Sequence, residues 1–203
     1  MLAQAIREAE RRLAMADPVM KRLIARHGSC PLAESRGEPF HMLASSIISQ
    51  QLSTKAAATI KQRVGELVGA PFQLQRVLSV SSEQLRGAGL SRAKMRYLRE
   101  LAARVSDSRL DFDALPSRDD EEVISALVEI PGIGRWTAEM FLIFGLKRMD
   151  VLALGDAGLQ RGARLLYGGK RKSVRLLPRV AEVWRPYRSI GSWYLWRSLE
   201  KAD

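Results

Sequence analysis

The stretch of sequence that decides the fold is Leu127-Val128-Glu129-Ile130-Pro131-Gly132-Ile133-Gly134-Arg135-Trp136-Thr137-Ala138. Pro131 lacks a backbone donor, and Gly132 and Gly134 adopt positive φ at little steric cost, so one helix ends here and another begins. The first N–H groups of the second helix lack partners within it, and the helix dipole is positive at that end. The stretch therefore predicts two helices joined by a tight turn that binds a phosphate group.

Helical spacing of apolar side chains continues along the rest of the chain, and no convincing alternation of apolar and polar residues predicts a strand. Ser53 and Ser91 each precede such a pattern, where a serine caps a helix. Ser117, followed by acidic residues, is expected to begin another helix. We expect an all-α fold with helices over 2–15, 18–27, 40–50, 54–68, 72–79, 82–86, 92–105, 117–129, 135–146, 157–167, 173–184 and 187–200.

The chain is strongly basic, which indicates a polyanionic partner. Its 203 residues include 33 Lys and Arg against 22 Asp and Glu, a formal net charge of +11 at pH 7. Such a charge favours nucleic acid over a membrane surface. The excess is concentrated after residue 155, although a run of charge is more often only a solvated face. The basic side chains that we expect to face DNA are Arg161, Arg164, Lys170, Arg171 and Lys172.

Cysteine and histidine usage limits the metal chemistry that the chain supports. Cys30 is the only cysteine, and His27 and His41 are isolated, so no zinc site and no iron–sulfur cluster are expected. The first residues lack the apolar core of a signal peptide, and no apolar run approaches ~20 residues. We expect a monomeric, cytoplasmic protein of bacterial type, associated with the nucleoid and not with a membrane.

Asp156 stands directly before Ala157-Gly158-Leu159, a position where aspartate caps a helix. The preceding stretch 149–155 is neutral to apolar apart from Asp150. A carboxylate in such surroundings strongly stabilises a developing positive charge. Both roles stay open, because a capping carboxylate also lies at the fixed end of a rigid helix.

Together these motifs resemble the helix-hairpin-helix DNA glycosylases of the HhH-GPD superfamily. Within it, the chain is most similar to the alkylation-repair branch, DNA-3-methyladenine glycosylase II. The resemblance covers about residues 35–200 and implies two helical lobes around a cleft, in one domain over 1–203, without the N-terminal mixed α/β domain of some members. The motifs that carry it are the hairpin with Arg135-Trp136-Thr137-Ala138, Gly155-Asp156 with Gly158 and Arg161, Ile47-Ile48-Ser49-Gln50-Gln51-Leu52-Ser53, Gly89-Leu90-Ser91-Arg92-Ala93-Lys94 and Pro186-Tyr187-Arg188-Ser189.

The resemblance implies a monofunctional DNA glycosylase for alkylated purines, of the 3-methyladenine and 7-methylguanine type. Such an enzyme flips the damaged nucleotide out of double-stranded DNA and hydrolyses its N-glycosidic bond, which begins base excision repair. Asp156 is the implied catalytic residue, because the transition state resembles an oxocarbenium ion. Trp136 stands where bifunctional relatives carry a nucleophilic lysine, so no lyase activity is expected. The alternatives are a non-catalytic hairpin module that only grips DNA, and a glycosylase for another damaged base.

Further site residues follow from the hairpin and the resemblance. We expect Leu90, as an exposed side chain on a tight turn, to enter the gap that flipping leaves, and Gln51 to face the orphaned base. A helix staple for Leu90 and a polar helix end for Gln51 are the ordinary alternatives. The base pocket is expected to comprise Trp136, Met140, Tyr187 and Trp196, although the tryptophans can also pack between helices. DNA-backbone contacts are expected at Gly132, Ile133, Gly134, Arg135 and Thr137, with a candidate monovalent cation, Na⁺ or K⁺, at the carbonyls of Val128, Ile130 and Ile133.

Overall fold

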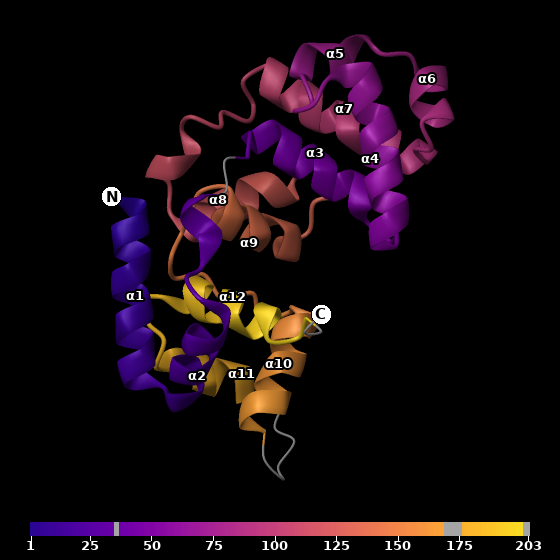
Figure 1. Cartoon of the computed structure of the whole chain (residues 1–203). Helices are drawn as coiled ribbons and strands as arrows, with labels where there is room; N and C mark the ends of the chain where they lie inside the picture. Colours follow the sequence, from indigo (N-terminus) through magenta and orange to yellow (C-terminus); the bar gives the residue numbers. More distant parts are fainter. Residues whose placement is uncertain (35–36, 169–175, 201–203) are drawn as a thin grey trace. The chain divides into compact units, whose positions relative to one another are not determined.

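The computed structural model describes residues 1–34, 37–168 and 176–200 (Figure 1). Within these ranges the chain forms helices and no strand, so the predicted all-α class is confirmed. The chain divides into two compact units. One comprises Met1–Arg36 with Lys147–Asp203, and the other comprises Gly37–Leu146. We refer to them as the terminal unit and the central unit.

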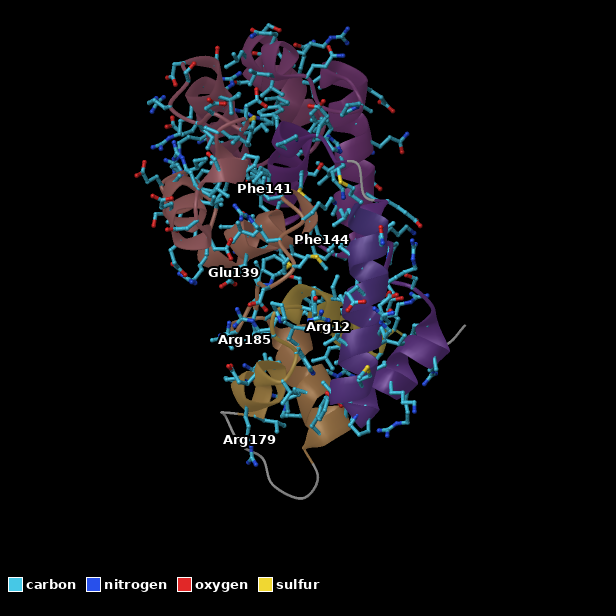
Figure 2. All side chains as sticks on the ribbon, turned by 90° about the vertical axis from the view of Figure 1, so that its left-hand side faces the viewer. Arg12, Glu139, Phe141, Phe144, Arg179 and Arg185 are labelled. Atoms are coloured by element: carbon cyan, nitrogen blue, oxygen red, sulfur yellow. The ribbon has the colours of Figure 1, made fainter. Side chains whose placement is uncertain are left out.

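The central unit contains the predicted hairpin. Its helices are α3 (Pro39–Ser49), α4 (Thr54–Val68), α5 (Leu74–Ser79), α6 (Ser82–Gly87), α7 (Arg92–Ser106), α8 (Asp120–Val128) and α9 (Arg135–Phe144). Helix α3 packs against α4, α7 and α9, and α8 packs against α9. Buried side chains such as Ile47, Leu98 and Phe141 form the core that fixes these helices, and Figure 2 labels Phe141. The hairpin α8–α9 therefore packs, through α9, against the helical core of the central unit.

The terminal unit combines an N-terminal and a C-terminal segment of the chain. Its helices are α1 (Leu2–Ala16), α2 (Pro18–His27), α10 (Ala157–Tyr167), α11 (Leu176–Glu182) and α12 (Arg188–Arg197). A buried carboxylate joins distant parts of it: Asp17 caps α2 through the N–H of Val19 at 2.7 Å, and its other oxygen accepts Tyr167 Oη at 2.6 Å and Trp184 Nε1 at 2.9 Å. A buried charge of this kind is tolerated because donors surround it.

The expectation that Ser117 begins a helix is wrong. Helix α8 begins at Asp120, and Asp119 is its cap. The Asp119 carboxylate accepts the N–H of Glu122 at 2.8 Å, and the Glu122 carboxylate accepts the N–H of Asp119 at 3.0 Å. This capping box satisfies two helix-end donors where a single serine would satisfy one. Ser117 instead closes a short 3₁₀ turn, in which its hydroxyl donates to the Ala114 carbonyl.

Two negative findings apply to the described part of the chain. None of its helices combines the length and the apolar character that a membrane span requires. It also holds no group of three or more His, Cys, Asp or Glu side chains arranged to bind a metal ion.

Candidate functional site

The turn between α8 and α9 has the glycine that its geometry requires. Gly132 has φ +88°, and a Cβ atom at this position would collide with the Tyr97 ring. Across the turn, Ile133 N–H donates to the Ile130 carbonyl at 2.9 Å. The Gly132 carbonyl accepts the side-chain amide of Gln50 at 2.5 Å. The turn is therefore held by contacts within the protein, from the Tyr97 ring and from the Gln50 amide.

Gly134 differs from the sequence expectation. Its φ is −93° and its ψ is 171°, so it does not use the left-handed region that the pattern suggested. It is the residue before the first turn of α9, and none of the described atoms would lie within 4 Å of a Cβ placed there, apart from those of its chain neighbours. The missing side chain thus leaves open space at the positive end of α9. An approaching phosphate needs such space.

The other predicted hairpin contacts divide into side chain and backbone. Ile133 and Thr137 are buried, so DNA contacts at these residues would be made through the backbone. The Arg135 guanidinium is paired with Glu121 at 2.5 Å and with Glu139 at 3.1 Å (Figure 2 labels Glu139). The hydrogen bond to Glu121 raises the pKa of Arg135, and the same bond lowers the pKa of Glu121. The backbone N–H of Arg135 is therefore better placed than its guanidinium to donate a hydrogen bond to a phosphate.

Asp156 lies at the N-terminus of α10 and is the cap that the sequence predicted. One carboxylate oxygen, Oδ1, accepts the N–H of Leu159 at 2.7 Å and the indole N–H of Trp196 at 2.9 Å. The residue is 8% exposed. A Cβ on Gly158 would lie 3.0 Å from Asp156 Oδ1 and 3.2 Å from Trp196 Cδ1. Gly158 thus provides the room in which the indole reaches the carboxylate.

The loop before Asp156 is fastened to the start of α12. Arg188 Nε donates to Asp150 Oδ1 at 2.7 Å, and its Nη2 donates to Asp150 Oδ2 at 3.0 Å. The Ser189 hydroxyl accepts the N–H of Val151 at 2.9 Å. Because α12 also carries Trp196, one helix fixes both the loop that leads to Asp156 and a direct donor to its carboxylate.

The remaining predicted pocket residues lie in both units. Trp136, the second residue of α9, is 49% exposed, whereas a tryptophan that only packs between helices is buried to a much greater extent. Met140 is half-buried one turn further along α9. In the terminal unit, Tyr187 directly precedes α12 and is half-buried, as is Trp196.

Leu90 does not match the expectation of an exposed wedge. It is only 3% exposed, and its N–H donates to the Leu85 carbonyl at 3.1 Å. Gly89, with φ +102°, turns the chain so that Leu90 enters the core before Ser91 caps α7. Leu90 and the buried Met95 occupy the two positions of a hydrophobic staple, which was the alternative interpretation.

Gln51, unlike Leu90, is exposed to solvent. It lies in the turn between α3 and α4 and has φ +56°. Lys94 and Gln50 support this turn, and the sequence patterns assigned neither of them that role. Lys94 Nζ donates to the Ile48 and Gln50 carbonyls, and the Gln50 side chain donates to the Gly132 carbonyl. These bonds join elements far apart in the chain, so no local pattern signals them. Of the basic set, Arg161 and Arg164 are exposed on α10, and the predicted contacts Lys170, Arg171 and Lys172 lie outside the described residues.

The carbonyls proposed for a monovalent cation belong to the end of α8 and the turn. The Ile130 carbonyl already accepts the N–H of Ile133, and its second lone pair remains suited to a cation. Neutral carbonyl oxygens are the ligands that hard cations of this kind prefer. The chemistry of the donor set therefore fits Na⁺ or K⁺.

Comparison with known proteins decides the family. Residues 44–186 match the HhH-GPD superfamily of base excision DNA repair proteins. The chain belongs to this superfamily. A relative from Saccharomyces cerevisiae, DNA-3-methyladenine glycosylase, is 36% identical over 194 residues, which cover 78% of this chain and 66% of the relative.

Two solved structures share the fold of this chain. DNA-3-methyladenine glycosidase from Bacillus halodurans is 40% identical with a TM-score of 0.76, and the match covers 90% of this chain and 89% of that one. The 3-methyladenine DNA glycosylase Mag1 of Schizosaccharomyces pombe, solved in complex with abasic DNA, is 29% identical with a TM-score of 0.80, over 96% and 98% of the two chains.

Proposed function

We propose that this HhH-GPD protein is a monofunctional DNA glycosylase that removes alkylated purines, such as 3-methyladenine and 7-methylguanine, from double-stranded DNA and so begins base excision repair. The relatives named above support this substrate class. The observation that carries the proposal is the Asp156 carboxylate, which two N–H donors hold at the N-terminus of α10. A module that only grips DNA would need a cap for α10, but it would not need a carboxylate that a second donor from α12 also holds.

Asp156 supplies the charge that the reaction requires. Cleavage of the bond between base and sugar leaves positive charge on the sugar, and a carboxylate in a poorly solvated place stabilises that charge strongly. Asp156 is such a group, since it is 8% exposed and its direction is fixed. An alkylated purine already carries positive charge and leaves readily, so no second carboxyl group is needed to protonate it.

Trp136 supplies the recognition of the base in this proposal. The exposed indole presents an aromatic face that attracts a cationic ring. Its position in the first turn of α9, whose N-terminus would hold the DNA phosphate, brings base and backbone recognition into one helix. An indole cannot form a Schiff base with the opened sugar, so the reaction ends at hydrolysis.

The partner and the ions follow from the same chemistry. The substrate is a DNA duplex with a damaged base, gripped at the hairpin and along the basic side chains of α10. We propose that the enzyme acts as a monomer in the cytoplasm, uses no zinc and no iron–sulfur cluster, and holds Na⁺ or K⁺ at the Val128, Ile130 and Ile133 carbonyls, where the cation would draw a phosphate oxygen toward the turn.

The test is to identify what the protein releases from DNA. Methylated duplex DNA is incubated with the enzyme, and the free bases are separated and identified by mass spectrometry. We expect 3-methyladenine and 7-methylguanine. Release of a different damaged base would indicate the other glycosylase class, and DNA binding without release of any base would indicate a hairpin module.

Borohydride trapping tests the absence of a lyase step. We expect no covalent adduct between protein and DNA. An adduct would contradict the monofunctional mechanism and would direct attention to Lys147, whose pKa is lowered by desolvation and which lies in the loop that leads to Asp156.

A further inference from the structure

Lys94 closes the end of helix α3 within the central unit. Its ammonium group donates to the Ile48 carbonyl and to the Gln50 carbonyl, each at 2.7 Å. The last carbonyls of a helix have no partner further along it, and a positive charge is favourable at that end. Burial lowers the pKa of Lys94, as expected for a side chain inserted into the protein. Lys94 therefore holds the corner where α3 turns into α4.

Gln50 connects that corner to the hairpin. Its side-chain amide donates to the Gly132 carbonyl at 2.5 Å, while its own carbonyl accepts Lys94. Gly132 lies against the ring of Tyr97, which is one turn from Lys94 on α7. Helix α7 thus supports the corner through Lys94 and the hairpin turn through Tyr97, and Gln50 joins the two supported elements directly.

Gln51 is the residue that this arrangement presents. It follows Gln50, is exposed, and has φ +56°, a conformation that is unfavourable for a residue with a side chain. Such a conformation persists where the surroundings enforce it, and it concentrates at functional sites. Here Lys94 binds the carbonyls of Ile48 and Gln50 on the N-terminal side of Gln51, and Ser53, two residues after Gln51, caps α4.

We propose that Lys94 and Gln50 are positioning residues that hold Gln51 at a fixed offset from the hairpin turn that grips the DNA backbone. Because Leu90 is buried, the exposed Gln51 is the predicted side chain left to enter the gap in the duplex. The inference rests on the proposed function. Because both DNA-contacting elements are fixed to α7, gripping the backbone also places Gln51 against the base stack. Their role is to make flipping efficient, while binding to intact DNA depends on the hairpin and the basic side chains.

The test separates flipping from binding. Flipping is followed by stopped-flow fluorescence of 2-aminopurine placed beside a lesion, and affinity is measured on an undamaged duplex. We expect Lys94→Met to slow flipping about tenfold and to change the affinity by less than about twofold, because the phosphate contacts remain. Lys94→Arg should recover part of the rate. Lys21→Met, an exposed lysine of the terminal unit, is the control for loss of charge and should match the wild type in both assays.

A double variant tests whether Lys94 acts through Gln51. Gln51→Ala should slow flipping to a similar extent, and Lys94→Met combined with Gln51→Ala should be no slower than the slower single variant. Losses that multiply, an unchanged flipping rate in Lys94→Met, or an equal fall of flipping and affinity would overturn the inference. Fluorescence reports flipping without bond cleavage, so a wild type that flips the base and releases nothing would refute only the proposed function.

Discussion

Trp196 donates its indole N–H to the Asp156 carboxylate at 2.9 Å, on the same oxygen that accepts the N–H of Leu159. This oxygen is therefore held by one donor from its own helix and one donor from α12. Two fixed donors set the direction of the carboxylate before a substrate arrives, which is the preorganisation that charge stabilisation requires.

Removal of the indole donor should slow catalysis. Trp196→Phe keeps an aromatic ring and loses the N–H, so the carboxylate is held by Leu159 alone. We expect the single-turnover rate of base release to fall about tenfold, since small errors in the placement of a reacting group are costly. Trp193→Phe is the matched control, because the Trp193 ring packs on Tyr194 and its substitution leaves the Asp156–Trp196 hydrogen bond in place. Equal rates for Trp196→Phe and Trp193→Phe would contradict the role of the hydrogen bond.

The two glycines of the hairpin turn should respond differently to alanine. Gly132→Ala places a methyl group at φ +88° against the Tyr97 ring, so we expect the free energy of unfolding to fall by about 2–4 kcal/mol. Gly134→Ala has ordinary φ and open space, so stability should change by less than about 0.5 kcal/mol. The methyl group of Gly134→Ala would occupy the space proposed for the DNA phosphate, so the affinity for DNA should fall. Urea unfolding and DNA titration measure the two effects, and a Gly134→Ala variant with unchanged affinity would argue against the phosphate site.

Acid should destabilise the fold through His41. Its Nδ1 accepts the N–H of Phe72 at 3.1 Å, which only a neutral ring can do, and desolvation followed by repulsion from Lys61 lowers its pKa from 6.5. As the pH falls below 6.5, His41 is therefore protonated in the unfolded chain before it is protonated in the folded protein. The stability that neutral His41 contributes above pH 6.5 is lost as the pH falls through the lower pKa of the folded state.

The pH effect is measured by urea unfolding at pH 7 and pH 5. We expect the free energy of unfolding to be lower at pH 5 than at pH 7, and His41 to account for no more than about 1 kcal/mol of that difference, because its ring is only partly buried. His41→Gln should remove that part. His27, whose pKa is also lowered by desolvation, contributes with the same sign and is tested by His27→Gln. A His41→Gln variant with the full pH dependence of the wild type would refute the assignment.

The exposed arginines of α10 should contribute to salt-dependent affinity. If Arg161 and Arg164 each contact a phosphate, the slope of log K against log salt should fall by about 1 for each Gln substitution. Arg11→Gln, an exposed arginine on α1 that pairs with Glu8, should leave the slope unchanged. An unchanged slope in the Arg161 and Arg164 variants would show that these arginines do not contact DNA phosphates.

The sequence predicted those features that local chemistry determines. Ser91 caps α7, Asp156 caps α10, and the glycine turn separates α8 from α9, because each signal acts within a few residues. Ser117 is also a residue type that caps helices, but α8 begins three residues later, where Asp119 and Glu122 form a capping box.

Long-range contacts were beyond the reach of sequence patterns. Nothing local connects Trp196 with Asp156, which are separated by 40 positions, or Lys94 with the end of α3. Leu90 shows a related limit, since an apolar residue after a glycine has the same local pattern whether the turn directs it outward or into the core. Its burial leaves Gln51 as the gap-filling candidate.

The role of Asp156 is tested most directly by single-turnover release of 7-methylguanine from a methylated duplex. Asp156→Asn keeps a side-chain oxygen for the Leu159 and Trp196 N–H groups, so the cap and the fold should survive. We predict that its rate falls at least about 100-fold, since the negative charge is lost, and that Asp113→Asn, an exposed loop aspartate, keeps the wild-type rate. A wild-type rate in Asp156→Asn would contradict the mechanism.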